Sequence, residues 1–205
     1  MPHNHVAKIQ FVRSLTLGCT SGASRPSPSP SQALADPRYG LKLKRQASFA
    51  KKPPRIGDPL PAFQLNTLSG QRIDPTQIRH GKILILDFGN FTCQPFRLRT
   101  PFIQEIAKRY AQQVQLVTVY SREANAGRAP FDAIAPPTTF DERLALARAY
   151  AQEYGVAWPV VVDEMDDRVF RTYGKPFTAT FIADQHGHLA FKGTWVPPQV
   201  VETQI

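Results

Sequence analysis

The sequence predicts an α/β protein with three layers, in which helices flank a mixed central β-sheet. Three observations lead to this fold class. Residues 82–88 and 114–120 are continuous apolar runs, the pattern of strands buried on both faces. Segments with helical spacing alternate with such runs, as they do in β-α-β units. A turn at residues 185–187 joins two final strands, which predicts a closing hairpin.

The first predicted elements are two short strands within residues 56–73, separated by a Ser-Gly turn. The first buried strand follows them. A helix is expected over residues 95–112, because proline is favoured in a first helical turn. Pro101 should kink or break this helix. Residues 114–120 then form the second central strand.

The second half of the domain begins with a helix whose two ends are marked in the sequence. Thr139 and Glu142 have the spacing of a capping box, and Gly155 ends the helix after Tyr154. The remaining expected elements are a strand at 160–163, a short helix at 168–173, and hairpin strands at 178–183 and 189–192.

The positive charge of the chain is confined to its N-terminal segment. Residues 1–55 contain ten Lys or Arg residues and one acidic residue, so they carry the whole net charge of +9. Residues 25–31 alternate Ser or Arg with Pro, a composition that buries little apolar surface. We therefore expect a basic, disordered tail at 1–55 and one globular domain at 56–205. The tail lacks interleaved aromatic residues, so no specific nucleic-acid partner is expected.

No apolar run approaches the roughly 18 residues of a membrane-spanning helix, which predicts a soluble protein. We expect a cytoplasmic location, with export or lipid anchoring through the short apolar stretch before Cys19 as an alternative. Two cysteines exclude a disulfide-built scaffold and a cysteine-type zinc domain. His186 and His188 lie in a predicted turn without suitable partners, so no metal site is expected.

Cys93 is the candidate for chemistry because it follows a buried strand and directly precedes a helix. The positive end of a helix dipole and its unpaired N–H groups stabilise a thiolate. Arg97 and Arg99 lie in the next turns and are expected to add to this effect. The sequence thus favours a nucleophilic thiolate near neutral pH, and the alternative is an inert buried cysteine.

The neighbours of Cys93 narrow the chemistry. Phe96 occupies the place where a dithiol oxidoreductase has its second cysteine. Asn90 and Leu86 stand where a typical peroxiredoxin has Thr and Pro. A domain with one cysteine needs an external thiol for regeneration, and Cys19 in the tail is the one intramolecular alternative.

Glu123 follows a strand that should lie beside the Cys93 strand. Chemistry in α/β folds lies at such strand ends, so Glu123 is expected to border the site. The alternative is a solvated carboxylate at the end of a strand.

Four segments of the sequence carry a family resemblance. Residues 57–63 and the strand-Cys-helix arrangement resemble the thioredoxin-like superfold. Residues 86–96 resemble the active-site segment of the iodothyronine deiodinases, with Cys93 at the selenocysteine position. Residues 119–124, 159–167 and 173–174 are similar to further motifs of that family, in order and at compatible spacing. The resemblance covers roughly residues 55–195.

The resemblance implies reductive dehalogenation with Cys93, Thr92 and Glu123 as catalytic residues. The Cys93 thiolate would attack iodine on an aromatic ring to give a sulfenyl iodide, and a second thiol would then release iodide. Two histidines of the family are replaced here, one by Asn125 and one near Pro137. Neither residue can supply a titrating imidazole.

Two other functions stay open at this point. One is a one-cysteine, peroxiredoxin-like thiol peroxidase that forms a sulfenic acid, and the other is a redox-inactive binding module. The expected partners are a small substrate, either a halogenated aromatic or a peroxide, and a thiol reductant such as glutathione or thioredoxin. No bound cofactor is expected, and the oligomeric state is open between a monomer and a homodimer.

Overall fold

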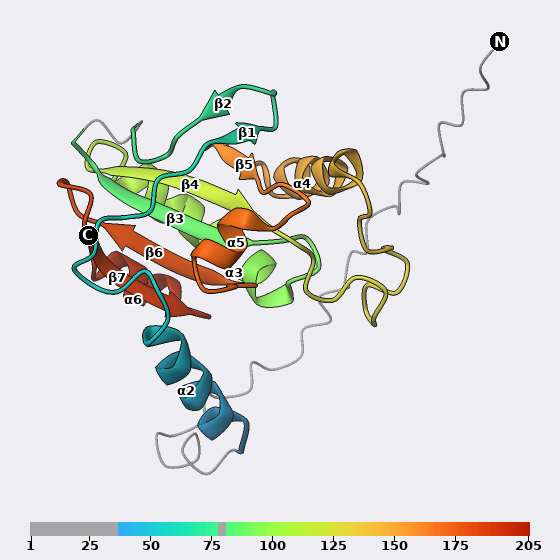
Figure 1. Ribbon diagram of the computed structural model, residues 1–205, viewed down its shortest axis with the longest axis horizontal. Coiled ribbons are helices and arrows are strands. Elements are labelled where there is room, and N and C mark those ends of the chain that lie inside the picture. The colour runs from blue at the N-terminus through green and yellow to red at the C-terminus, as the bar shows by residue number, and fades with distance from the viewer. Residues whose placement is uncertain (1–36, 78–80) are drawn as a thin grey trace, which may run out of the picture. The chain divides into compact units, whose positions relative to one another are not determined.

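A computed structural model describes residues 37–77 and 81–205. Its strands are β1 Leu65–Thr67, β2 Arg72–Ile73, β3 Ile83–Gly89, β4 Val114–Tyr120, β5 Val160–Val162, β6 Ala179–Ala183 and β7 Leu189–Thr194. Its helices are α2 Pro37–Ala50, α3 Gln94–Arg109, α4 Phe140–Tyr154, α5 Arg168–Thr172 and α6 Pro198–Glu202. Over the described ranges, seven strands form one sheet in the order β2-β1-β5-β4-β3-β6-β7 (Figure 1).

Strand β3 lies between β4 and β6 in the sheet. It pairs in parallel with β4, where Phe88 lies opposite Val119, and antiparallel with β6, where Phe88 lies opposite Ala179. Six of its seven residues are buried, as the continuous apolar run predicted. The predicted mixed sheet, its central strands and its closing hairpin are confirmed.

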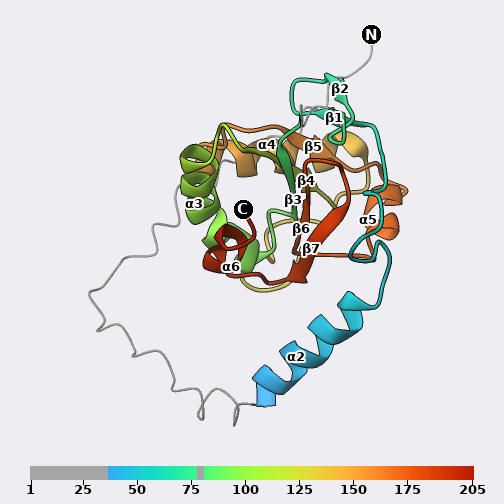
Figure 2. The ribbon, with the colours of Figure 1, turned by 90° about the vertical axis from the view of Figure 1, so that its left-hand side faces the viewer.

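Helices cover both faces of the sheet. On one face, α3, α4 and α6 bury residues such as Ile103, Tyr150 and Val201 against the strands. On the other face, α5 contributes Val169 to a cluster that includes Phe181 of β6. Figure 2 shows the sheet nearly edge-on, with α3 and α6 on one side and α5 on the other. The three-layer α/β prediction is therefore confirmed.

The ends of α4 are those that the sequence predicts. The Thr139 hydroxyl accepts a hydrogen bond from the Glu142 N–H at 3.3 Å, and the Glu142 carboxylate accepts one from the Thr139 N–H at 3.2 Å. Gly155 ends the helix with φ at 58°, a left-handed conformation that glycine adopts without a steric penalty. Local sequence signals therefore predict both ends of this helix.

Pro101 was expected to kink or break α3, and the helix continues through it, so the break does not occur. Pro101 itself is exposed, while Ile103 and Ile106 are buried on the same helix. Packing of this apolar face outweighs the loss of one backbone hydrogen bond. Helix α6 was also not anticipated from the sequence.

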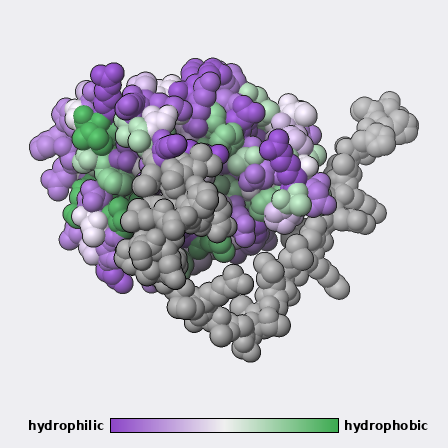
Figure 3. All heavy atoms as spheres, turned by 90° about the horizontal axis from the view of Figure 1, so that it is seen from below, coloured by the Kyte–Doolittle hydropathy of each residue, from purple (hydrophilic) through white to green (hydrophobic). Residues whose placement is uncertain are grey.

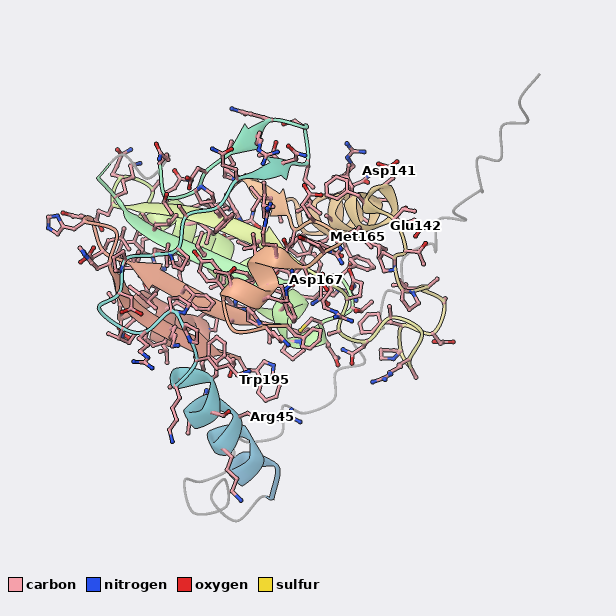
Figure 4. All side chains as sticks on the ribbon, in the orientation of Figure 1. Arg45, Asp141, Glu142, Met165, Asp167 and Trp195 are labelled. Carbon is pink, nitrogen blue, oxygen red and sulfur yellow. The ribbon has the colours of Figure 1, made fainter. Side chains whose placement is uncertain are left out.

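Helix α2 lies inside the segment predicted to be a disordered tail, and that expectation is wrong for residues 37–50. Phe49 is 5% exposed and its ring lies 5.7 Å from the ring of Phe181. The Arg45 guanidinium lies 5.5 Å from the centre of the Trp195 ring, and the two side chains face each other in Figure 4. The rest of the predicted tail, residues 1–36, falls outside the described residues, and the domain boundary at residue 55 remains a prediction.

The face of the domain seen in Figure 3 is mainly polar where it is coloured. Hydrophilic side chains cover most of the coloured part of the face in Figure 3, and apolar residues occur there in small patches. Among the residues that the structure describes, no helix is both long enough and apolar enough to cross a membrane.

Candidate functional site

Cys93 lies at the junction of β3 and α3, where the sequence places it. It is the N-cap residue of α3, and its carbonyl accepts a hydrogen bond from the Arg97 N–H at 3.1 Å. Its own N–H donates to the Asn90 carbonyl at 3.2 Å. Cys93 is therefore held at the start of the helix, but the residue is only 4% exposed.

The carboxylate of Glu123 holds the loop that precedes Cys93. One of its oxygens accepts hydrogen bonds from the Thr92 N–H at 2.8 Å and from the Thr92 hydroxyl at 2.7 Å. The other oxygen accepts a short hydrogen bond from the Tyr120 hydroxyl, which in turn accepts one from the Phe91 N–H at 3.0 Å. The structure thus brings Thr92 and Glu123 together beside Cys93.

Two asparagines complete this network, and no motif in the sequence indicates their role. The side-chain oxygen of Asn90 accepts from the Ala124 N–H at 3.1 Å. The side-chain amide of Asn125 donates to the Thr92 carbonyl at 2.8 Å, and its backbone N–H donates to the Thr92 hydroxyl at 3.0 Å. Asn125, which stands where the resemblance places a histidine, here fixes the loop before Cys93.

The expectation of a readily ionised thiol at Cys93 is contradicted. Burial raises the pKa of the Cys93 thiol, and the negative charge of Glu123 raises it further. The Phe96 N–H in the first turn of α3 and the Thr178 hydroxyl lower this pKa, but they do not outweigh burial. The helix N-terminus does stabilise the thiolate, as predicted, yet desolvation is the larger effect.

The two arginines expected to favour the thiolate have other partners. Arg97 pairs with Glu153 at 2.6 Å and donates to the Tyr154 hydroxyl at 3.1 Å. Arg99 is buried and paired with Asp87, and burial lowers its pKa to about 10. Because a carboxylate neutralises each guanidinium, the predicted assistance from both residues is wrong.

Thr178 is a residue of the site that the sequence analysis missed. It precedes β6, whose register with β3 places Ala179 opposite Phe88 and so brings Thr178 next to the loop of Cys93. The Asn90 side-chain amide donates to the Phe177 carbonyl at 3.2 Å, which joins the two segments. A threonine before a strand carries no functional signal until the strand order is known.

Metal ligands and the second cysteine are the remaining candidates for chemistry. Within residues 37–77 and 81–205, no group of three or more His, Cys, Asp or Glu side chains could hold a metal ion. His188 lies in the turn between β6 and β7, where its N–H donates to the carboxylate of Asp184 at 2.9 Å. Cys19, the candidate resolving thiol, falls outside the described residues.

Comparisons with known proteins agree on the fold. A family model described as iodothyronine deiodinase matches residues 37–203. The thioredoxin domain of a thiol-disulfide oxidoreductase from Bacteroides vulgatus superposes with a TM-score of 0.55 at 18% identity, over 72% of this chain and 96% of that one. The thioredoxin-like fold is thereby confirmed.

A curated relative is also described as a thiol-disulfide oxidoreductase. Thiol-disulfide oxidoreductase ResA of Geobacillus thermodenitrificans is 27% identical over 134 residues, which is 64% of this chain. The chain spans 65% of that relative, just under two thirds of its length.

The expectation of a cytoplasmic location is contradicted by the comparisons. A secreted disulfide oxidoreductase of Mycobacterium tuberculosis, described as homologous to DsbE of E. coli, superposes with a TM-score of 0.52 at 16% identity. That match covers 69% of this chain and 92% of the other. The expectation rested on the apolar stretch before Cys19, which is short and carries a charge, and that stretch falls outside the described residues.

Proposed function

The chain belongs to the iodothyronine deiodinase family, and on that premise we propose that it is a thiol-disulfide oxidoreductase that works through the single thiol of Cys93. The observation that carries the proposal is the placement of Cys93 at the N-terminus of α3, after a loop that Glu123 holds through Thr92. The descriptions of the relatives as oxidoreductases agree with this assignment.

The proposed reaction is thiol–disulfide exchange. The Cys93 thiolate attacks one sulfur of a disulfide, the S–S bond breaks, and the other sulfur leaves as a thiolate. Cys93 is then held in a mixed disulfide. An external thiolate attacks that bond, carries away the substrate sulfur as a new disulfide, and releases Cys93 as a thiolate.

The need for an external thiol is inferred from the residue three positions after Cys93. A dithiol site discharges its mixed disulfide with a second cysteine at that position, which Phe96 occupies here. Phe96 is fully buried, and its ring lies 4.9 Å from the ring of Tyr150. The core thus fills the space of a resolving thiol, which supports a reductant such as glutathione or thioredoxin.

Reductive deiodination is the second candidate, and the family match favours it. The thiolate would take iodine from an aryl iodide while a proton replaces it on the ring, giving Cys93–S–I. One thiol would then displace iodide to form a mixed disulfide, and a second thiol would restore Cys93. The side-chain amide of Asn125 donates to the Thr92 carbonyl, and an amide cannot act as a general acid or base near neutral pH. We therefore expect iodide release to be slower than disulfide exchange.

The test compares three substrates on one preparation of the full chain with glutathione as the reductant. Consumption of hydroxyethyl disulfide, consumption of hydrogen peroxide and iodide release from an iodothyronine are each measured. Cys93→Ser should lose the disulfide reaction, whereas the matched variant Cys19→Ser should keep it. Full disulfide turnover in Cys93→Ser would contradict the proposal. A faster Cys93-dependent reaction with peroxide would favour the thiol peroxidase, and no turnover with any substrate would favour a binding module.

A further inference from the structure

The hydroxyl of Thr178 is buried next to the reactive thiol without a partner of its own. Thr178 is 3% exposed, and its hydroxyl oxygen makes no hydrogen bond within the part of the chain that the structure describes. Leaving a buried hydroxyl unpaired costs free energy, because water would otherwise satisfy it. Such a group in a folded core calls for an explanation.

The strand pairing places Thr178 beside the site. Phe88 of β3 and Ala179 of β6 are paired, so Thr178 follows alongside the segment that leads to Cys93. The Asn90 side chain holds the adjacent Phe177 carbonyl at 3.2 Å. Thr178 and Cys93 therefore belong to two loops that one hydrogen bond joins.

We propose that the Thr178 hydroxyl is a hydrogen-bond donor reserved for the ionised form of Cys93, which makes Thr178 a further catalytic residue. This inference rests on the proposed function. A neutral thiol is a weak hydrogen-bond partner, whereas a thiolate is a charged acceptor. A threonine hydroxyl rotates freely enough to pair with the sulfur when the charge appears. Thr178 lowers the pKa of Cys93, which is the direction that this role requires.

The other side chains that the structure describes around Cys93 do not donate a hydrogen bond to its thiolate. Glu123, from the loop after β4, carries a negative charge and opposes the thiolate. Tyr120 of β4 and Tyr150 of α4 are phenols whose pKa burial raises, so they stay neutral. Arg97 of α3 pairs with Glu153. The Phe96 N–H is the other donor that favours the thiolate, and it is fixed by the helix.

The role in the reaction follows from where charge develops. Cys93 is a thiolate before it attacks a disulfide, and it becomes a thiolate again when an external thiol displaces it from the mixed disulfide. Thr178 donates a hydrogen bond at both moments and transfers no proton. Both charge-forming steps are stabilised relative to the neutral thiol and the mixed disulfide.

The test uses three variants of the full chain. Thr178→Val removes the hydroxyl at nearly constant shape, and Thr178→Ser retains a hydroxyl. Thr194→Val is the matched control. The Thr194 hydroxyl is also buried without a partner among the described residues, and Thr194 lies on β7, opposite Ala179 of β6. Formation of the mixed disulfide on Cys93 with hydroxyethyl disulfide is followed by peptide mass spectrometry from pH 6 to 10, in a single turnover without reductant.

Thr178→Val should raise the pKa in this profile by about one unit, the scale of one hydrogen bond to an ionised group. At pH 7 the thiolate fraction then falls about tenfold while its intrinsic nucleophilicity rises about threefold, so the rate falls about threefold. From pH 6 to 10 the rate should rise with pH in both proteins, and the rising limb of Thr178→Val should lie at higher pH than that of the wild type. Thr178→Ser and Thr194→Val should keep the wild-type profile.

The melting temperature separates this role from a structural one. An unpaired buried hydroxyl adds nothing to the folded state, so Thr178→Val should melt no lower than the wild type. An unchanged profile in Thr178→Val would overturn the inference, and so would a clear loss of stability. If Thr178→Val shifts the profile but the wild type shows no catalytic turnover, the inference holds and the proposed function fails. If turnover depends on Cys93 but Thr178→Val shifts nothing, the proposed function holds and the inference fails.

Discussion

Thr92 donates two hydrogen bonds to one carboxylate oxygen of Glu123, from its backbone N–H at 2.8 Å and from its hydroxyl at 2.7 Å. Because Thr92 directly precedes Cys93, this pair fixes the backbone at the reactive residue. The same carboxylate raises the pKa of Cys93 through its charge. Glu123 therefore favours the fold of the loop and opposes ionisation of the thiol.

Replacing Glu123 by Gln should separate these two effects. The amide can no longer accept on both sides, so one of the bonds from Thr92 or Tyr120 is lost, and hydrogen bonds to charged groups contribute about 1.5–3 kcal/mol each. We expect the free energy of unfolding to fall by that order in urea denaturation. The pKa of Cys93, measured by the pH dependence of alkylation, should fall because the negative charge is removed.

Glu105→Gln is the control for this prediction. Glu105 lies on the same helix as Cys93, is exposed and pairs with Lys108, so its replacement removes one carboxylate without disturbing Thr92. The pKa of Cys93 should then stay at its wild-type value. If Glu123→Gln and Glu105→Gln shift that pKa equally, or if Glu123→Gln raises it, the assigned role of Glu123 is wrong.

Phe49 should be essential to the stability of the domain although it lies in the predicted tail. Its side chain is buried against Phe181, and truncation of a buried phenylalanine to alanine typically costs about 3–5 kcal/mol. Phe49→Ala should lower the free energy of unfolding by that amount in urea denaturation. Phe102→Ala is the control, since Phe102 is 58% exposed and its loss should change little. Equal effects of the two substitutions would show that α2 does not pack as described.

The raised pKa of Cys93 predicts a loss of stability at alkaline pH. The folded protein holds the thiol proton to a higher pH than the unfolded chain, whose thiol has a pKa of about 8.5. The contribution of the protonated Cys93 thiol to the free energy of unfolding is complete below that value, and it is lost as the pH rises toward the folded-state pKa. Between about pH 8 and 9.5, the free energy of unfolding should fall more steeply in the wild type than in Cys93→Ala. Parallel curves for the two proteins would contradict the raised pKa.

The parts of the fold that were predictable depend on local or periodic signals. Thr139, Glu142 and Gly155 define the ends of α4 within one stretch of sequence. The continuous apolar run of β3 predicts burial on both faces, and the burial of six of its seven residues confirms it. Helix α2 was missed because its stability depends on the contact of Phe49 with Phe181, more than a hundred residues away.

The site was predictable in position but not in electrostatics. Cys93 and Glu123 are identified by the strand ends they follow, and the structure brings them together. The partner of Arg99 could not be read from the sequence, because Asp87 faces it only after α3 packs on β3. Thr178 was missed for the same reason, since its place beside Cys93 depends on the pairing of β3 with β6.

The central claim is that one thiol, Cys93, carries the reaction and that an external thiol restores it. The most direct measurement is rapid-quench peptide mass spectrometry of the full chain with hydroxyethyl disulfide and glutathione. We predict a mixed disulfide on Cys93 that forms and disappears at least as fast as the steady-state turnover. A Cys93–Cys19 disulfide as the intermediate, or steady turnover while Cys93 stays a free thiol, would contradict the claim.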